Sequence, residues 1–372
     1  MLKVGITGQA GFVGTHLYNT IGLSTEEFKR VNFEKSFFDN DTSLDSFVAQ
    51  CDIIVHLAAM NRHNDQEVIY TTNVGLVKKL VASLERTASK AHVIMSSSSQ
   101  EEKDNLYGKS KREGRELLAH WAVANGGLFT GMIIPNVFGP FGHPYYNSVV
   151  ATFSHQVANG EIPEIQVDGD LKLIYVGELV KEIIDKIKAK DNTALYTVAH
   201  TAEAKVSEIL KLLQGYKEQY QDKGEIPEIN NTFELNLFNT YRCYMDIKSY
   251  FPVKFTQHTD PRGTFVEIIR LGVGGQVSFS TTVPGITRGN HYHTRKIERF
   301  AVIKGKALIQ LRKIGTDEVF DFYLDGEEPA YVDMPIWYTH NIKNVGDEVL
   351  YTNFWINEFY DPSDPDTFFE NV

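Results

Sequence analysis

The feature that most constrains the fold of this chain is a glycine-rich turn near its N-terminus. The turn reads Gly8-Gln9-Ala10-Gly11-Phe12-Val13-Gly14, directly after an apolar segment, residues 3–7, that predicts a buried strand. Apolar residues at helical spacing follow it. Glycines at this spacing permit a tight turn, close approach of backbone to a pyrophosphate, and close packing of helix on sheet. The sequence therefore predicts a dinucleotide site contacted by Gly8, Gly11, Phe12 and Val13.

The sequence pattern changes after about residue 240, which divides the chain into two predicted domains. Over the first 200 residues, apolar strands alternate with amphipathic helices, as is typical of an α/β Rossmann-type doubly wound parallel sheet. From about Cys243, segments such as residues 276–282 and 307–312 read as strands joined by turns, which predicts an all-β barrel or sandwich. With 372 residues the chain is long enough for two domains, which we expect at residues 1–240 and 244–372.

The end of the second predicted strand, residues 28–33, indicates which dinucleotide binds. Folds that bind NAD usually place an acidic residue there, on the ribose 2′-hydroxyl. Here the corresponding residue is Asn32, and the nearby Arg30 and Lys35 could pair with a 2′-phosphate. NADPH is therefore favoured over NADH, with two alternatives open: Glu34 could compete for these cations, and all of these side chains could be exposed loop residues.

A tyrosine and a lysine four residues apart, Tyr107 and Lys111, open a predicted helix and share one of its faces. A nearby ammonium lowers the pKa of a tyrosine, which is about 10 in water. Such a phenol could donate a proton to a carbonyl oxygen while hydride arrives at the carbon. Upstream, residues 96–99 are four serines that end a strand at the carboxyl edge of the sheet, so one of these hydroxyls could hold the same oxygen.

The strongest single motif lies in the C-terminal half and predicts a metal site. His291 and His293 are two residues apart and share one face of an extended segment; Glu298 follows after a turn, and His340 comes from a later strand. Three imidazoles and one carboxylate form a ligand set for a divalent cation. The set suits Zn²⁺, with Ni²⁺, Mn²⁺ and Fe²⁺ as alternatives.

Composition excludes several classes of partner. The formal net charge is −11 and basic residues are not clustered, which argues against nucleic-acid binding. The sequence contains no run of about 18 apolar residues, so it predicts no membrane-spanning helix. The two cysteines, Cys51 and Cys243, suggest no disulfide framework, and the first residues do not read as a signal peptide, so we expect a cytoplasmic location.

The motifs of residues 1–240 together resemble the extended short-chain dehydrogenase/reductase family that acts on nucleotide sugars. They are TGQAGFVG, VHLAA (residues 55–59), Asn73, SSSS, YGKSK and PNVFGP (residues 135–140). The resemblance implies that Tyr107 donates the proton, that Lys111 is its partner and holds the nicotinamide ribose, and that Ser97 or Ser98 completes the site. It also implies cofactor contacts at Leu57, Ala58 and Ala59, and nucleotide-sugar contacts at Asn136, Tyr146 and Asn147.

Residues 244–372 resemble the cupin superfamily. Within it, the segments DPRGTFVE (residues 260–267) and TRGNH (residues 287–291) look like the dTDP-4-keto-6-deoxysugar 3,5-epimerase branch. The resemblance implies that Arg262 and Arg288 anchor the substrate, although each could instead pair with a local carboxylate. The histidine matching His291 is the general base in those epimerases, which need no metal, so the metal ligands here leave that role open.

Chemistry predicts the order in which two such domains would act on a 4-keto sugar. A ketone at C4 acidifies the C3 proton, because the resulting anion is an enolate that a cation can stabilise. After reduction of C4 to an alcohol, the C3 proton is no longer acidic. The cupin should therefore epimerise first, and the reductase should then trap the product.

A reductase-like half followed by a cupin-like half resembles a family of bifunctional capsular polysaccharide biosynthesis enzymes over essentially the whole chain. The segments YYNSVVATF (residues 145–153) and the ending YDPSDPDTFFENV also resemble segments of that family. The resemblance implies C3 epimerisation and NADPH reduction at C4 of a UDP-2-acetamido-2,6-dideoxy-hexos-4-ulose. The product would be UDP-2-acetamido-2,6-dideoxy-L-talose, on the route to UDP-N-acetyl-L-fucosamine. It further implies zinc in the cupin and a homodimer.

Three alternatives remain open on the sequence. The first is a reductase whose metal cupin is only structural. The second is a non-catalytic sensor that binds NAD(P) or a sugar, and the intact Tyr107 and Lys111 pair speaks against it. The third is an NAD-dependent 4-epimerase, which would retain NAD⁺ tightly.

Overall fold

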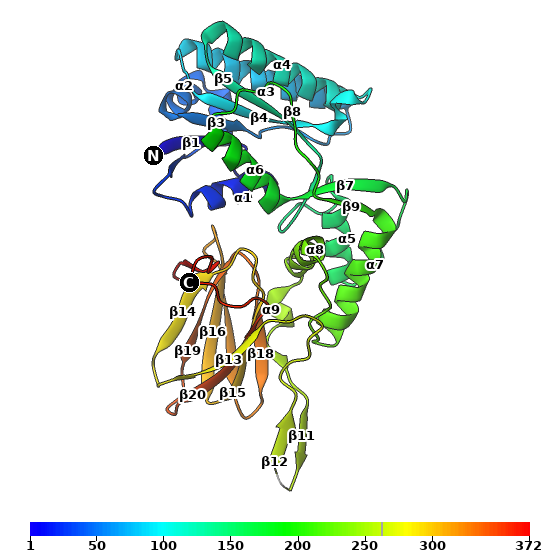
Figure 1. Ribbon diagram of the computed structural model, residues 1–372, viewed down its shortest axis with the longest axis vertical. Coiled ribbons are helices and arrows are strands. Elements are labelled where there is room, and N and C mark those ends of the chain that lie inside the picture. The colour runs from blue at the N-terminus through cyan, green and yellow to red at the C-terminus, as the bar shows by residue number, and fades with distance from the viewer. Residues whose placement is uncertain (262) are drawn as a thin grey trace. The chain divides into compact units, whose positions relative to one another are not determined.

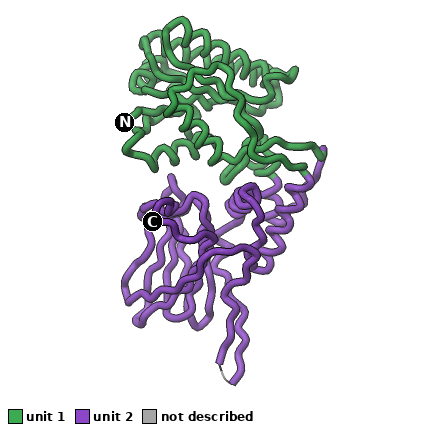
Figure 2. The backbone as a smooth tube through the Cα atoms, in the orientation of Figure 1, with its two compact units in different colours: residues 1–152, 168–206 green, residues 153–167, 207–372 purple. Residues whose placement is uncertain are grey.

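The computed structural model describes residues 1–261 and 263–372, and their contacts divide the chain into two compact units (Figure 2). The first unit contains residues 1–152 and 168–206, and the second contains residues 153–167 and 207–372. This division groups residues 207–240 with the β-rich half. The boundary near residue 240, which was drawn from the change in sequence pattern, stays a prediction.

The first unit is built on a six-stranded parallel sheet in the order β2-β1-β3-β4-β5-β8 (Figure 1). Its strands are β1 (Leu2–Thr7), β2 (Phe28–Val31), β3 (Ile53–His56), β4 (His92–Ser98), β5 (Leu128–Ile134) and β8 (Tyr196–Thr197). Its helices are α1 (Phe12–Ile21), α2 (Asp41–Gln50), α3 (Gln66–Arg86), α4 (Leu106–Asn125) and α6 (Val176–Ala189), with short turns η1 (Lys35–Asp39) and η2 (Ser99–Glu102); α5 (Val149–Ala158) runs into the second unit. The predicted Rossmann-type sheet is confirmed.

Alternating side chains of the central strands supply two separate cores. Ile54 points to the face covered by α2, α3 and α4, whereas Ile53 and Val55 point to the face covered by α1 and α6. This period of two on a strand buried on both faces explains why the segment is apolar throughout. A small mixed sheet that the sequence pattern did not predict adds β6 (Asn136–Phe138), β7 (Asp170–Tyr175) and β9 (Ala202–Lys205).

The second unit contains two five-stranded antiparallel sheets. The first, in spatial order, is β10 (Val253–Lys254), β18 (Ala330–Met334), β15 (Glu298–Lys304), β20 (Leu350–Ile356) and β13 (Gln276–Thr282). The second is β17 (Val319–Asp325), β16 (Lys306–Lys313), β19 (Tyr338–Asn344), β14 (Thr287–Tyr292) and β21 (Phe368–Phe369). A separate hairpin joins β11 (Gln257–Asp260) to β12 (Gly263–Val266), and the helical elements are α7 (Val206–Tyr216), the π-helical turn η3 (Lys217–Asp222), α8 (Thr232–Arg242) and α9 (Ile247–Tyr250).

The two sheets face one another, and helical segments cover the outer face of the first. On β15, the Phe300 ring lies 5.7 Å from the ring of His340 on the opposite sheet, measured between centroids. The preceding residue, Arg299, points outward and pairs with Asp333 at 2.7 Å. The Tyr220 hydroxyl of η3 donates to the same carboxylate at 2.7 Å. This buried network explains why residues 207–242 belong to the β-rich unit.

Among the described residues, no helix combines the length and the apolar character that crossing a membrane requires.

Candidate active site and metal centre

The glycine turn in the first unit has the close packing that its sequence predicts. Gly8 adopts a left-handed φ of 78°, and Gly11 caps the start of α1. A Cβ at Gly14 would lie 2.2 Å from the Gly8 carbonyl oxygen, so only glycine allows the helix to approach the turn this closely. Phe12 and Val13 form the first positions of α1, where backbone N–H groups have no intrahelical partner and can bind phosphate.

Leu57 and Ala58 lie against this turn, and the half-buried Ala59 follows them. The Leu57 N–H donates to the Thr7 carbonyl at 3.1 Å, and a Cβ at Gly8 would lie 2.9 Å from the Ala58 nitrogen. The buried Asn73 fixes the next residue, because its amide both accepts from the Met60 N–H (2.7 Å) and donates to the Met60 carbonyl (3.0 Å). Residues 57–60 are therefore held by the glycine turn at one end and by Asn73 of α3 at the other.

The residues predicted to read the adenosine ribose take three different positions. The Asn32 amide accepts from the Gln9 side chain at 2.8 Å and is thereby tied to the glycine turn. The Arg30 guanidinium lies 4.4 Å from the centre of the Tyr18 ring, on α1, and Lys35 is an exposed residue that begins η1. Arg30 and Asn32 also line a pocket of about 560 Å³ with Lys3 and Lys29, and none of the described residues that line it is acidic. This pocket suits an anion.

Tyr107 lies at the start of α4 and is hydrogen-bonded to Ser98, the last residue of β4. Burial raises the pKa of Tyr107 to about 12, and the hydrogen bond with Ser98 offsets only part of this effect. The expectation that Lys111 lowers the pKa of Tyr107 is therefore wrong for this structure, because desolvation of the phenolate is the larger effect. A raised pKa keeps the phenol protonated at neutral pH, which is the form that can donate a proton.

Lys111 lies one turn further along α4 and is 5% exposed. Burial lowers its pKa to about 8, because an ammonium group loses hydration there, while the carboxylate of Glu101 acts in the opposite direction. Lys111 therefore stays mainly charged at neutral pH, although it is nearly inaccessible to solvent.

Glu101, which the sequence analysis did not identify, separates the roles of the two candidate serines. The Ser97 hydroxyl donates to the buried Glu101 carboxylate, which also pairs with Arg115 at 2.8 Å. Ser97 is therefore occupied by the packing of the loop that leads to α4, whereas Ser98 contacts Tyr107. No sequence signal marks Glu101, since an acidic residue in an apparently exposed turn is common.

The predicted sugar-contacting residues surround Tyr107 only in part. Tyr146 is close enough to influence the ionisation of Tyr107, and its hydroxyl accepts from the Asn61 N–H at 3.2 Å. Arg62, which was not predicted, donates to the Tyr146 carbonyl at 2.9 Å and so holds the loop in place. Asn147 is exposed, and the Asn136 side chain donates to the Lys172 carbonyl at 3.3 Å.

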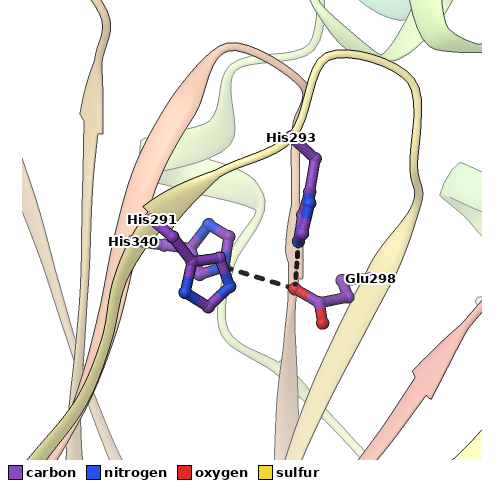
Figure 3. A group of neighbouring side chains, drawn as sticks. All are labelled: His291, His293, Glu298 and His340. Atoms are coloured by element: carbon purple, nitrogen blue, oxygen red, sulfur yellow. Dashed lines mark hydrogen bonds and ion pairs between the residues drawn. The ribbon is translucent and has the colours of Figure 1, made fainter. Parts of the chain in front are cut away.

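The four predicted metal ligands of the second unit lie together between the two sheets (Figure 3). His291 lies on β14, His293 directly follows that strand, Glu298 begins β15 and His340 lies on β19. One ligand atom from each of the four lies within 4.8 Å of the other three. Antiparallel pairing explains the convergence, because β14 and β19 place His291 opposite His340.

The chemistry of this cluster fits a divalent cation. Glu298 Oε2 lies 3.1 Å from His293 Nε2 and 3.2 Å from His340 Nε2, and the neighbouring imidazoles hold the pKa of Glu298 well below its usual range. The second contact lacks hydrogen-bond geometry, so the buried His340 Nε2 has no hydrogen-bond partner among the described residues. Burial lowers the pKa of His291 to about 4, whereas Glu298 raises that of His293. A carboxylate and a buried imidazole nitrogen without a hydrogen-bond partner are suitable metal ligands.

Of the two arginines predicted to anchor the substrate, the structure describes only Arg288. Arg288 is an exposed residue of β14, on the same strand as His291. Arg262 lies outside the described residues.

Comparison with known proteins divides the chain in a similar way. Residues 4–199 match the model of the NAD dependent epimerase/dehydratase family, and residues 258–368 match the polysaccharide biosynthesis C-terminal domain. The spore coat polysaccharide biosynthesis protein SpsL of Bacillus subtilis is 27% identical over 123 residues, which cover 30% of this chain and 82% of that protein.

Two relatives are similar over the full length. The UDP-2-acetamido-2,6-beta-L-arabino-hexul-4-ose reductase of Pseudomonas aeruginosa is 32% identical, over 99% of this chain and 98% of its own. The crystal structure of the capsular polysaccharide assembling protein CapF from Staphylococcus aureus superimposes with a TM-score of 0.63 at 34% identity, and covers 100% of both chains. With its parallel sheet, glycine turn and full-length relatives, the chain belongs to the NAD dependent epimerase/dehydratase family.

Proposed function

We propose that the first unit is an NADPH-dependent reductase of the C4 ketone in a UDP-2-acetamido-2,6-dideoxy-hexos-4-ulose. The observation that carries this proposal is the contact of Ser98 with Tyr107, one helical turn from the buried Lys111. The full-length similarity to a reductase named for a UDP-linked 4-keto sugar supports the substrate class.

The side chains suggest how the proton is handled. Ser98 and Tyr107 would both hydrogen-bond the ketone oxygen. Tyr107 would donate its phenolic proton to that oxygen as hydride addition to C4 places negative charge on it. NADPH, when bound, supplies the hydride to C4. The Lys111 ammonium would stabilise the phenolate left behind and hold the nicotinamide ribose.

The cofactor is proposed to bind along the glycine turn. The pyrophosphate would accept hydrogen bonds from N–H groups at Gly11, Phe12 and Val13, with Gly8 allowing the approach. Leu57, Ala58 and Ala59 would line the cofactor. A 2′-phosphate would be bound by Asn32, Arg30 and Lys35, and the absence of acidic residues among the described residues lining the pocket at Arg30 and Asn32 supports NADPH.

We propose that residues 244–372 form a cupin that epimerises C3 of the same sugar before reduction. His291, His293, Glu298 and His340 would hold a divalent cation, most suitably Zn²⁺. Such a cation supplies positive charge that stabilises an enolate. Arg262 and Arg288 would anchor the substrate in this domain, and Asn136, Tyr146 and Asn147 would contact it in the first unit. The product of the two steps would be UDP-2-acetamido-2,6-dideoxy-L-talose. The chain would act as a homodimer.

One observation favours a second candidate function, in which the metal is only structural. The cluster offers four protein ligands, the number that structural zinc sites usually have, whereas catalytic zinc sites usually keep three and leave a position open. In that case the first unit would reduce a substrate whose C3 configuration is already set.

Proton NMR of the UDP-4-keto substrate in D₂O with the full chain distinguishes these functions. We expect deuterium at C3 before NADPH is added and a C4 alcohol after it. Reduction without earlier exchange at C3 would support the structural metal and exclude the epimerase. Exchange without reduction would exclude the reductase.

A further inference from the structure

The last residues of the chain contact the strand that carries the metal ligands. The short strand β21 pairs with β14 and places Phe369 opposite His291 and Phe368 opposite Tyr292. The Glu370 N–H also donates to the Asn290 carbonyl at 3.0 Å. This C-terminal segment, residues 364–370, therefore lies directly beside two of the four ligands.

Asp366 is the most strongly bonded residue of this segment. It is 3% exposed and adopts a left-handed φ of 40°. Its carboxylate accepts from the backbone N–H groups of Thr294 (3.1 Å), Arg295 (3.0 Å) and Lys296 (3.1 Å), and from the Thr294 hydroxyl at 2.6 Å. Side chains of charged residues are rarely buried unless their acceptors are satisfied in this way.

The backbone of the same residue contacts a metal ligand. The Asp366 carbonyl oxygen lies 2.5 Å from His293 Nδ1. A carbonyl can only accept, so Nδ1 is the protonated nitrogen, and Nε2 is left facing Glu298 Oε2 at 3.1 Å. The contact fixes the orientation of the ring and keeps the proton on Nδ1, so that Nε2 is the nitrogen that could bind a cation.

We propose that Asp366 is a positioning residue of the metal centre, and this rests on the proposed metal function. Its carboxylate holds the loop of residues 294–296, and this places its carbonyl on His293 Nδ1, so that Nε2 points to the cation. Partners of this kind orient ligating histidines and usually change metal affinity about 10–100-fold when removed. The sequence motif supplies the four ligands, but the C-terminal segment sets the geometry of one of them.

The test is zinc affinity of the purified full chain, measured by competition with a chromophoric chelator. Asp366→Gly removes the carboxylate but tolerates the left-handed φ, so it separates the lost hydrogen bonds from backbone strain. We expect its affinity to fall about 10–100-fold. Asp366→Asn, which keeps one acceptor oxygen, should recover part of the loss.

The matched control is Asp364→Ala. Asp364 lies two residues earlier in the same segment, and its largely exposed carboxylate pairs with the Arg295 side chain at 2.9 Å. We expect its zinc affinity to stay within about twofold of the unchanged chain, because a surface ion pair contributes little.

A second readout does not depend on the metal. In the metal-free chain, ¹H–¹⁵N NMR should show a proton on His293 Nδ1 that exchanges slowly with solvent, and Asp366→Gly should make this exchange faster. Equal zinc affinity of Asp366→Gly and the unchanged chain, with both folded by circular dichroism, overturns the positioning role and leaves the metal site intact. An unchanged chain that binds no zinc overturns the proposed metal function and this role with it.

Discussion

The two candidate sites differ in how much of the chain is needed to build them. In the first unit, Ser98, Tyr107 and Lys111 come from one strand end and the first turns of the helix after it. In the second, the four ligands come from residues 291–340, on three strands of two facing sheets. Local segments therefore determine the first site, whereas the pairing of strands and the packing of the two sheets determine the second.

The sites also differ in charge. In the first, Tyr107 is neutral and Lys111 carries a buried positive charge, whose loss of hydration lowers its pKa to about 8. In the second, the Glu298 carboxylate lies beside buried imidazoles; burial lowers the pKa of His291, and Glu298 raises that of His293. The comparison teaches that the first site joins a neutral acid to a buried positive charge, whereas the second clusters a carboxylate with three imidazoles, a set that could hold a cation.

The largest expected effect tests whether the sites are independent. Tyr107→Phe removes the proton donor, and we expect reduction of the C4 ketone to fall about 10²–10⁴-fold, which is the usual contribution of general acid catalysis. Deuterium exchange at C3 and zinc content should be unchanged. Stopped-flow NADPH oxidation measures reduction, and NMR measures exchange at C3. Loss of both activities in this variant would contradict the assignment of two independent sites.

The reciprocal change is His293→Ala. We expect loss of C3 exchange and of tight zinc binding, because one of four ligands is missing. Reduction of a substrate that already has the product configuration at C3 should continue. A variant that reduces this substrate no better than Tyr107→Phe would contradict the separation.

The two serines sharpen the account of the first site. Ser98→Ala removes the hydroxyl that contacts Tyr107, and we expect kcat to fall about 10–100-fold, as for loss of one hydrogen bond to the developing charge. Ser97→Ala should change kcat less than about threefold, because that hydroxyl is bonded to Glu101. The reverse order in steady-state kinetics would assign the catalytic hydroxyl to Ser97.

The smallest effect concerns pH. Lys111 has a pKa of about 8, so its ammonium is present below that pH, and kcat/KM for reduction should fall as the pH rises through about 8. The carboxylate of Glu101 raises the pKa of Lys111, so Glu101→Gln should shift this alkaline limb to lower pH. Activity at pH 7 should stay within about twofold. A limb that does not move would show that Glu101 acts only in packing.

Sequence reasoning was most accurate where one local pattern demands one local structure. The glycine turn predicted the end of β1 and the start of α1, and the strand of residues 276–282 has the predicted bounds. It missed the small sheet of β6, β7 and β9, because those strands pair with partners distant in sequence, and it missed Glu101, because the burial of a carboxylate in a turn cannot be read from its sequence neighbours. It also predicted the wrong direction for the pKa of Tyr107, since burial cannot be read from spacing.

The sequence by itself determined the glycine turn, the pair of Tyr107 and Lys111, and the identity of the four clustered side chains. Spacing along a helix or strand was sufficient for these, because backbone geometry alone decides which residues share a face. Only the tertiary structure decided that Ser98 rather than Ser97 contacts Tyr107, and that the Asp366 carbonyl contacts His293. Such contacts depend on desolvation and on pairing between distant segments, which no local pattern encodes.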